Sequence, residues 1–416
     1  MEHARFLFLF IYIAIAAFGY ALEYLNIRHL RRRHSPLPQE LEREIDPDLL
    51  SRAEAYTIGK TKFGIVSSLC NNSVFLVFFF GGGLEWYDRW IKSLGHEFML
   101  SGVLFFILLS FAVSVLNIPF KLYHAFVIEK RYGFNTMTPL VWAADLVKGA
   151  AVSTALMVVA VSAALWLYAE SPEFWWVWLW FFYLGLSIFL MYVSPYVIEP
   201  LFNKFEPVGD PALEESIRGL MGKAGIKVSR VFKMDASRRT AHTNAYFTGI
   251  GRVKRIVLYD TLLEKLTGKE IAAVLAHETG HWKKRHLLKG IMLSEAVALI
   301  SLYLAHILLK GGFLNELFGI SGGSFFTGVF ILGFLGSIAS FPFEPIFSYI
   351  SRRHEREADR FSYGLTGDSR AMIGSLVKLS KDNLSNLHPH PLYVAIHYSH
   401  PPVAERIRDL RKLEGG

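Results

Sequence analysis

Long apolar stretches alternate with short polar segments along this chain of 416 residues. A helix needs about 20 apolar residues to cross the hydrocarbon core of a membrane, and about seven stretches reach that length. Asn71 and Asn72 interrupt the second stretch. The pattern predicts a mainly α-helical, polytopic membrane protein with spans at approximately 6–25, 64–83, 99–120, 149–169, 174–196, 287–309 and 325–350.

Composition supports the membrane class. Hydrophobic residues make up 52% of the chain and charged residues 19%, whereas about a quarter of a soluble domain is charged. The net charge is +8, and the basic residues lie beside apolar stretches, which favours membrane lipid as the partner. We find no nucleic-acid-binding module. The single cysteine, Cys70, excludes a zinc site built from several thiolates.

The basic residues also predict an orientation, because loops rich in lysine and arginine stay in the cytoplasm. Such clusters follow the first, third and seventh stretches and lie between the fifth and sixth. We therefore expect the N-terminus outside and the segments 197–286 and 351–416 inside. The residues that carry this expectation are Arg31, Arg32, Arg33, Lys130, Arg131, Lys283, Lys284, Arg285, Arg352 and Arg353.

The chain divides into four parts by this pattern. Residues 1–196 hold five spans with a cytoplasmic linker at 26–63, whose portion 35–60 is a linker or a helical arm. Residues 287–350 hold two spans, and residues 351–416 form a C-terminal cytoplasmic segment. Between them, 197–286 predicts a small α/β insert, with a helix at 211–224, strands at 228–234, 244–248 and 255–259, and a turn at 249–251.

The insert carries the residues with the clearest chemistry. His277 and His281 are four residues apart, so a helix places both imidazoles on one face, able to bind one metal ion. Glu278 adjoins the first histidine and suits the general base of a metalloprotease. Thr267 and Glu270 form a capping box that starts the helix, which we expect to continue through His286 into the sixth span. The alternative is two surface histidines on an amphipathic helix.

Two histidines leave a catalytic zinc ion one protein ligand short. After the seventh span, Glu355 and Asp359 are four residues apart and share a helix face, whereas Glu357 points elsewhere. We take Glu355 as the third ligand and Asp359 as the acceptor that orients a ligand imidazole. Spacing alone leaves the choice among these acidic neighbours open, and a solvated charged helix is the other interpretation.

These motifs together resemble the type I CAAX prenyl protease family of membrane zinc endopeptidases. The resemblance rests on His277-Glu-Thr-Gly-His281 with Glu355-Arg-Glu-Ala-Asp359, and it extends along the chain. Further similar segments are Glu199-Pro-Leu-Phe-Asn-Lys-Phe-Glu-Pro207, Asn244-Ala-Tyr-Phe-Thr-Gly249, Arg255-Ile-Val-Leu-Tyr-Asp-Thr-Leu-Leu263, and His397-Tyr-Ser-His400-Pro-Pro402 followed by Glu405-Arg406.

The resemblance implies seven helices around a chamber, one zinc ion at the cytoplasmic side, and removal of the last three residues of prenylated CAAX proteins. It implies that His400 lies near the scissile bond, supported by Arg406. It also implies that Asn244, Ala245, Tyr246 and Phe247, with Arg406, bind the peptide.

Each implied role has a plain structural alternative. His400 is otherwise a packed tail histidine, Arg406 part of a solvated helix, and 244–247 a strand of the insert. Glu295, His306 and Glu344 fall inside apolar stretches, where ionisable groups serve either function or helix contacts.

Two rival functions remain at this stage. One is a general membrane quality-control protease without a prenyl requirement, and the other is a transporter with a bound metal. The host, the oligomeric state and the substrate's route to the site are left open. The membrane would be the cell membrane in a prokaryote and that of the endoplasmic reticulum in a eukaryote.

Overall fold

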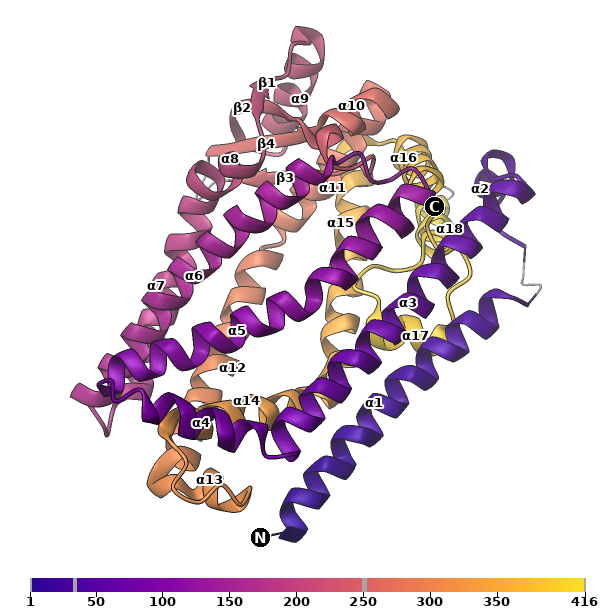
Figure 1. Ribbon diagram of the computed structural model, residues 1–416. Coiled ribbons are helices and arrows are strands. Elements are labelled where there is room, and N and C mark those ends of the chain that lie inside the picture. Colours follow the sequence, from indigo (N-terminus) through magenta and orange to yellow (C-terminus); the bar gives the residue numbers. More distant parts are fainter. Residues whose placement is uncertain (1, 33–35, 249–252, 415–416) are drawn as a thin grey trace.

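The computed structural model describes residues 2–32, 36–248 and 253–414 (Figure 1). In this part of the chain, seven helical segments are long and apolar enough to cross a membrane, which confirms the number of spans. They are His3–Leu30, Pro47–Phe80, Phe98–Glu129, Pro139–Glu170, Trp175–Phe202, His286–Leu317 and Phe325–Thr366.

The first half of the chain is almost entirely helical. Its helices are α1 (Glu2–Leu30), α2 (Gln39–Glu44), α3 (Pro47–Phe80), α4 (Gly83–Ser93), α5 (Phe98–Tyr123), α6 (Pro139–Glu170), α7 (Trp175–Val193) and α8 (Glu199–Phe202). Single π-helical turns, His124–Glu129 and Ser194–Ile198, extend α5 and join α7 to α8.

The second apolar stretch belongs to a helix that begins much earlier than its apolar part. Pro47 opens α3, and the side chain of Asp46 caps it by accepting a hydrogen bond from the backbone N–H of Leu49. Most of 35–60 is therefore a helical arm. Within the span, Asn71 donates to Asn117 (3.1 Å) and Asn72 to Tyr20 (2.8 Å). Polar side chains inside a membrane are tolerated when neighbouring helices satisfy them in this way.

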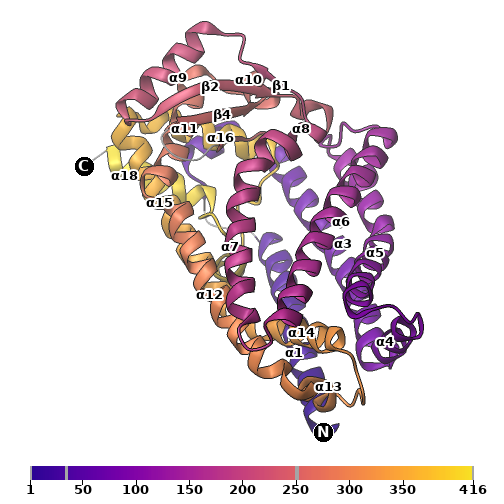
Figure 2. The same cartoon turned by 90° about the vertical axis from the view of Figure 1, so that its left-hand side faces the viewer.

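The seven spans enclose a chamber, and Figures 1 and 2 show what lies at its two ends. At the end nearest the N-terminus, α4 and α13 (Phe313–Leu317) pack with the spans around a buried apolar cluster that includes Leu84, Phe105 and Phe326. At the opposite end lie the sheet and the C-terminal helices. The described part of the insert and the C-terminal segment therefore share one end of the molecule.

The insert contains a four-stranded sheet in the order β1-β2-β4-β3. The strands β2 (Lys227–Met234) and β4 (Val253–Tyr259) pair in parallel, and β3 (Ala245–Thr248) pairs antiparallel with β4. The sequence did not predict β1 (Phe205–Pro207), which pairs antiparallel with β2. It is only three residues long and contains a proline, so it carries no alternating pattern. The turn predicted at 249–251 lies outside the described residues.

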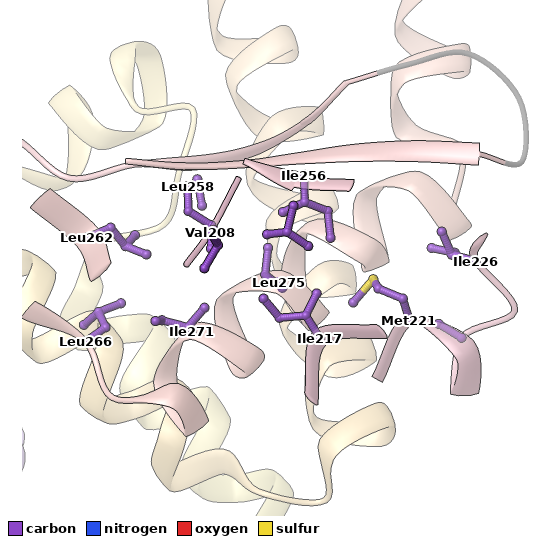
Figure 3. Packing of buried hydrophobic residues seen from close by; sticks show 13 residues of the cluster. Val208, Ile217, Met221, Ile226, Ile256, Leu258, Leu262, Leu266, Ile271 and Leu275 are labelled. Carbon is purple, nitrogen blue, oxygen red and sulfur yellow. The ribbon is translucent and has the colours of Figure 1, made fainter. Parts of the chain in front are cut away.

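Packed against one face of the sheet, α9 (Pro211–Lys223), α10 (Asp260–Lys265) and α11 (Gly268–Lys283) complete the insert. Figure 3 shows their common core, where Ile217 and Met221 of α9 and Leu275 of α11 pack beneath Ile256 of β4. All four side chains are fully buried. This core fixes α11 against the sheet and so determines which face of α11 is left for other contacts.

The helix that we expected to run on into the sixth span is broken. The helix α11 ends at Lys283, and Arg285 adopts a left-handed conformation (φ 56°) before α12 (His286–Leu309) begins. The last span is also divided, into α14 (Phe325–Ser340) and α15 (Glu344–Thr366), joined by a short 3-10 turn. The chain ends with α16 (Ser369–Asp382), α17 (Pro391–His397) and α18 (Val403–Glu414).

Candidate metal centre

The helix α11 is started by the capping box that the sequence predicts. The backbone N–H of Glu270 donates to the Thr267 hydroxyl, and the Glu270 carboxylate accepts from the backbone N–H of Thr267. Glu270 also forms an ion pair with Lys378 of α16 at 2.8 Å. The start of α11 is thus tied to the C-terminal segment as well as to the insert.

A glycine sets the distance between α11 and α15. A Cβ atom on Gly280 would lie 2.9 Å from the Cα atom of Ala358, closer than real Cβ contacts allow. The missing side chain therefore lets the two backbones cross in direct contact. Because Glu355 lies one turn before Ala358 on α15, this crossing brings its carboxylate to the face of α11 that carries His277 and His281.

Three donor groups converge where the two helices cross. The Nε2 atoms of His277 and His281 are 3.2 Å apart. The Glu355 carboxylate lies 3.4 Å from Nε2 of His277 and 3.2 Å from Nε2 of His281. His277 and Glu355 are buried, and His281 is partly exposed. The three ligand atoms lie within 4.8 Å of one another, and among the described residues no other group of three has this form.

The chemistry of these donors fits a metal ion. Nδ1 of each imidazole lies within hydrogen-bond distance of a separate partner, so Nε2 of each ring can offer its lone pair to a metal ion beside the Glu355 carboxylate. Three electron-rich atoms that face one another are stable only around a positive charge. Two imidazole nitrogens and a carboxylate oxygen are a donor set that zinc accepts.

His277 contacts Asp359, the residue for which the sequence predicts an orienting role. Nδ1 of His277 lies 2.8 Å from the Asp359 carboxylate, which in turn accepts two hydrogen bonds from Arg406, at 2.6 and 2.9 Å. Burial lowers the pKa of His277, but hydrogen bonds with Asp359 and Glu355 together raise it to about 9. A proton can therefore hold these groups together until a metal ion displaces it.

His281 is oriented by a residue that sequence reasoning missed. Its Nδ1 atom lies 3.1 Å from Nδ1 of His286, the first residue of α12, and Nε2 of His286 lies 3.1 Å from the Glu357 carboxylate. The His286 ring also stacks on His354, with centroids 3.9 Å apart. Glu357 points away from the three donors, but it contacts His281 indirectly through His286. Only the break at Arg285 turns His286 toward His281, so spacing gave no signal for this contact.

Glu278 and His400 are near the same centre. Burial raises the pKa of Glu278, and His277, His281, Glu355 and His400 are the charged neighbours that act on it. Nδ1 of His400 lies 2.8 Å from the Glu355 carboxylate, while 64% of its side chain stays exposed. The structure thus brings the tail histidine to the metal ligands, with its ring still open to a substrate.

The loop that carries His400 is fixed by Arg352, which the sequence indicated only as a basic residue after the last span. The Arg352 guanidinium donates to the backbone carbonyls of Val394 (2.8 Å), Tyr398 (2.7 Å) and Ala395 (3.3 Å). Arg352, Glu355 and Asp359 lie on one buried face of α15. A single helix face therefore holds the tail loop, supplies a metal donor and orients His277.

The predicted peptide-binding segment forms the edge strand of the sheet, since β3 is last in the strand order and contacts α11. Its side chains are already engaged. Ala245 and Phe247 pack into the core of the insert, and Tyr246 donates to Glu199 at 2.8 Å. Asn244, which precedes β3, is exposed. Its side-chain oxygen accepts a hydrogen bond from the backbone N–H of Ala245 at 2.8 Å.

Arg406, which the resemblance also implies in peptide binding, is nearly buried, with 10% of its side chain exposed. Its guanidinium donates two hydrogen bonds to Asp359. Its contacts make it a support of the metal centre. The three intramembrane groups, Glu295, His306 and Glu344, do not join the three donors in the described chain. Glu344 starts α15, about three helical turns before Glu355.

Comparisons with known proteins cover nearly the whole chain. Residues 26–204 match the family described as CAAX prenyl protease N-terminal, five membrane helices, and residues 207–414 match peptidase family M48. The CAAX prenyl protease 1 homolog of Arabidopsis thaliana is 33% identical over 92% of this chain and 93% of its own length. CAAX prenyl protease 1 of Saccharomyces cerevisiae is 33% identical over 95% of this chain and 93% of its own length.

A solved structure supports the same relationship. The crystal structure of S. mikatae Ste24p is similar with a TM-score of 0.91 and 30% sequence identity, covering 98% of this chain and 99% of that one. The match to a peptidase family decides against the metal transporter that the sequence left open. The chain belongs to peptidase family M48, in its CAAX prenyl protease branch, and is an integral membrane metalloendopeptidase.

Proposed function

We propose that this protein is a zinc endopeptidase that holds one zinc ion through His277, His281 and Glu355. The observation that carries the proposal is the convergence of the three donors, with the two Nε2 atoms 3.2 Å apart and the Glu355 carboxylate beside both. Three protein ligands leave the fourth zinc position open for water, which distinguishes catalytic from structural zinc sites.

Zinc in this position would lower the pKa of a water molecule and polarise the scissile carbonyl. The remaining steps belong to the chain. Glu278 accepts the proton of the attacking water and passes it to the leaving amine. Burial raises the pKa of this carboxyl, so its carboxylate is a stronger base than an exposed glutamate.

His400 serves the oxyanion in this mechanism. In its protonated form the ring donates from Nδ1 to Glu355, at 2.8 Å, and from Nε2 to the oxygen of the tetrahedral intermediate. Asp359 holds His277 in the tautomer that offers Nε2 to the metal, and Arg406 holds Asp359. Both supporting residues act without touching the substrate.

We assign the peptide to the open edge of β3. An extended chain that adds to a sheet edge is bound through its backbone, so many sequences are accepted. This suits the engaged side chains of Ala245, Tyr246 and Phe247, which leave the backbone and Asn244 for the substrate.

By relationship to the proteins named CAAX prenyl protease 1, the substrate is the C-terminal segment of a prenylated protein, cut before its last three residues. A chamber within the membrane suits a lipidated tail. The basic connections between spans support an active site that faces the cytoplasm. The host membrane is then the cell membrane of a prokaryote or the endoplasmic reticulum of a eukaryote.

One relative favours a second candidate function. A Bacillus subtilis protein named only as an uncharacterized metalloprotease is 30% identical over 88% of this chain and 87% of its own length. That name states no prenylated substrate, which keeps the alternative from the sequence, a membrane quality-control protease that needs no prenyl group. A matched pair of peptides, farnesylated and unmodified but otherwise identical, separates the two. Equal cleavage of both would show that no prenyl group is required and would favour the alternative.

The variant Glu278→Gln tests the mechanism. It keeps the size of the side chain but removes the base, so cleavage should be lost while the protein still binds one zinc ion. A chelator should stop the wild type, and added zinc should restore it. Metal content measured on the same samples serves as the control. Cleavage that survives in Glu278→Gln, or in metal-free protein, would refute the proposed mechanism.

A further inference from the structure

A cavity of about 830 Å³ lies between the sheet and the end of the fifth span. Tyr196 and Pro200, from the last turns of that span, line one side, and Phe205, Arg230 and Arg255 of the strands line the other. Figure 2 shows α8 at this junction, between the upper end of α7 and the sheet. The cavity shares no residue with the metal centre.

Arg255 of β4 carries a positive charge in this cavity that is not paired with a carboxylate. Its guanidinium carbon lies 4.1 Å from the centroid of the Phe232 ring and 4.7 Å from that of Phe205. One nitrogen donates to the backbone carbonyl of Pro195 at 3.2 Å, but Nε is buried and has no hydrogen-bond partner. No carboxylate of the described chain forms an ion pair with Arg255. A half-buried cation without an anion is costly.

Two more cations line the same cavity. The side chains of Lys204 and Arg230 are exposed, and neither has an ion pair among residues 2–32, 36–248 and 253–414. The one acidic residue in the lining, Glu206, is 66% exposed and lies 3.6 Å from Lys233, outside the cavity. Three positive charges around a concave surface therefore attract an anion with several acceptor oxygens.

The position of the cavity indicates which anion. Tyr196, Val197 and Leu201 belong to a membrane span and are 55%, 56% and 46% exposed, so this end of the span presents an apolar surface that lipid can cover. Tyr192 and Tyr196 stack beside each other on this surface, and tyrosines gather at the level of lipid headgroups. The cationic cavity thus adjoins an apolar surface at the end of a membrane span.

We propose that this cavity binds the headgroup of an anionic phospholipid. Its phosphate is bound by Arg255, Lys204 and Arg230, and its acyl chains lie along Tyr196 and Leu201. A free phosphate would satisfy the same cations, but it would leave the adjoining apolar surface unused. The bound lipid ties the sheet to the end of the fifth span and so stabilises the insert on the membrane body.

The test is a lipid titration of delipidated protein in a neutral detergent, with bound lipid counted by native mass spectrometry. Phosphatidylglycerol should bind and phosphatidylcholine should not. The double variant Lys204→Glu, Arg230→Glu should weaken phosphatidylglycerol binding by about tenfold to a hundredfold, the range for charge-assisted hydrogen bonds. Both side chains are exposed, so the fold is not at risk.

Lys227→Glu is the matched control, because Lys227 is exposed, lies on β2 like Arg230, and does not line the cavity. It should leave lipid binding unchanged, and inorganic phosphate should not displace the lipid. Equal losses in the control, equal binding of the two lipids, or full displacement by inorganic phosphate would each overturn the proposal. The titration does not depend on protease activity, so Glu278→Gln should bind the lipid like the wild type.

Discussion

His277 and His281 lie one turn apart on α11, yet the protein supports their imidazoles in different ways. His277 contacts a carboxylate directly, and that carboxylate is held by Arg406 in a buried ion pair. His281 contacts a second imidazole, His286, which in turn contacts Glu357. The side chains of Asp359 and Arg406 are 8% and 10% exposed, whereas those of His281 and Glu357 are each 27% exposed.

The difference teaches where charge can be kept. On the buried side of the metal centre, a carboxylate needs a matching cation, because water cannot solvate it. On the more exposed side, water and Arg353, which lies 3.1 Å from Glu357, stabilise the charge of the Glu357 carboxylate. The neutral imidazole of His286 then links this carboxylate to His281. Breaking the buried support should therefore cost more than breaking the exposed one.

The largest effect is expected from Asp359→Asn. This change takes away the carboxylate that accepts two hydrogen bonds from the buried Arg406 and leaves it Glu355 at 3.7 Å. It should lower the free energy of unfolding by about 3–5 kcal/mol. Zinc affinity should fall as well, because His277 loses its acidic partner. Thermal unfolding in detergent and zinc titration measure the two quantities. The double variant Asp359→Leu, Arg406→Met should recover most of the stability but none of the zinc affinity. Stability equal to wild type in Asp359→Asn would contradict the buried-pair account.

Gly280→Ala should disturb the contacts of both histidines, because Asp359 and Glu357 both lie on α15. The added methyl group would lie 2.9 Å from Ala358 and push α15 away from α11, at a cost of about 1–3 kcal/mol in unfolding free energy. Zinc affinity should drop because Glu355 moves with α15. Gly222→Ala on α9, where nothing lies within 4 Å, is the matched control and should leave zinc binding unaltered. If both variants behave alike, the close crossing is not what brings the three donors together.

His286→Ala removes only the link between His281 and Glu357. Zinc affinity should fall by about tenfold to a hundredfold, the usual range for a lost partner of a metal-ligating histidine. The fold should persist, because no buried charge is left unpaired. His286→Gln offers a carbonyl oxygen to Nδ1 of His281 and should restore part of the affinity. A cobalt-substituted sample would report the change in ligand geometry by its visible spectrum. An unchanged affinity and spectrum in His286→Ala would show that His281 needs no such partner.

Glu357→Gln should have the smallest effect. The amide still accepts a hydrogen bond from His286, so the change removes only the charge-assisted part, worth about 0.5–1.5 kcal/mol of zinc binding free energy. The comparison is with Asp359→Asn, the same chemical change on the buried side. Zinc titrations of the two variants in the same buffer give the ratio of their zinc affinities directly. A larger loss in Glu357→Gln than in Asp359→Asn would reverse the comparison.

The local patterns of the sequence predicted the elements that depend on neighbours in the chain. The seven spans follow from apolar length, and the start of α11 follows from Thr267 and Glu270. Three strands follow from β-branched and aromatic residues between Gly and Asp breaks. The strand β1 and the break at Arg285 were not predicted. The first depends on pairing with a distant strand, and the second on a left-handed residue with no glycine to signal it.

For the metal centre, the sequence by itself determined the chemistry: two imidazoles one turn apart, a glutamate between them and an acidic run after the last span. Helical spacing is a local property, so it needs no knowledge of the fold. Only the tertiary structure decided which acid meets the imidazoles, because the crossing at Gly280 sets the position of Glu355 against α11. It also decided that His286, Arg352 and Arg406 support the site. Arg352 and Arg406 reach partners 46 and 47 residues away in the chain, and His286 reaches His281 because the chain turns at Arg285.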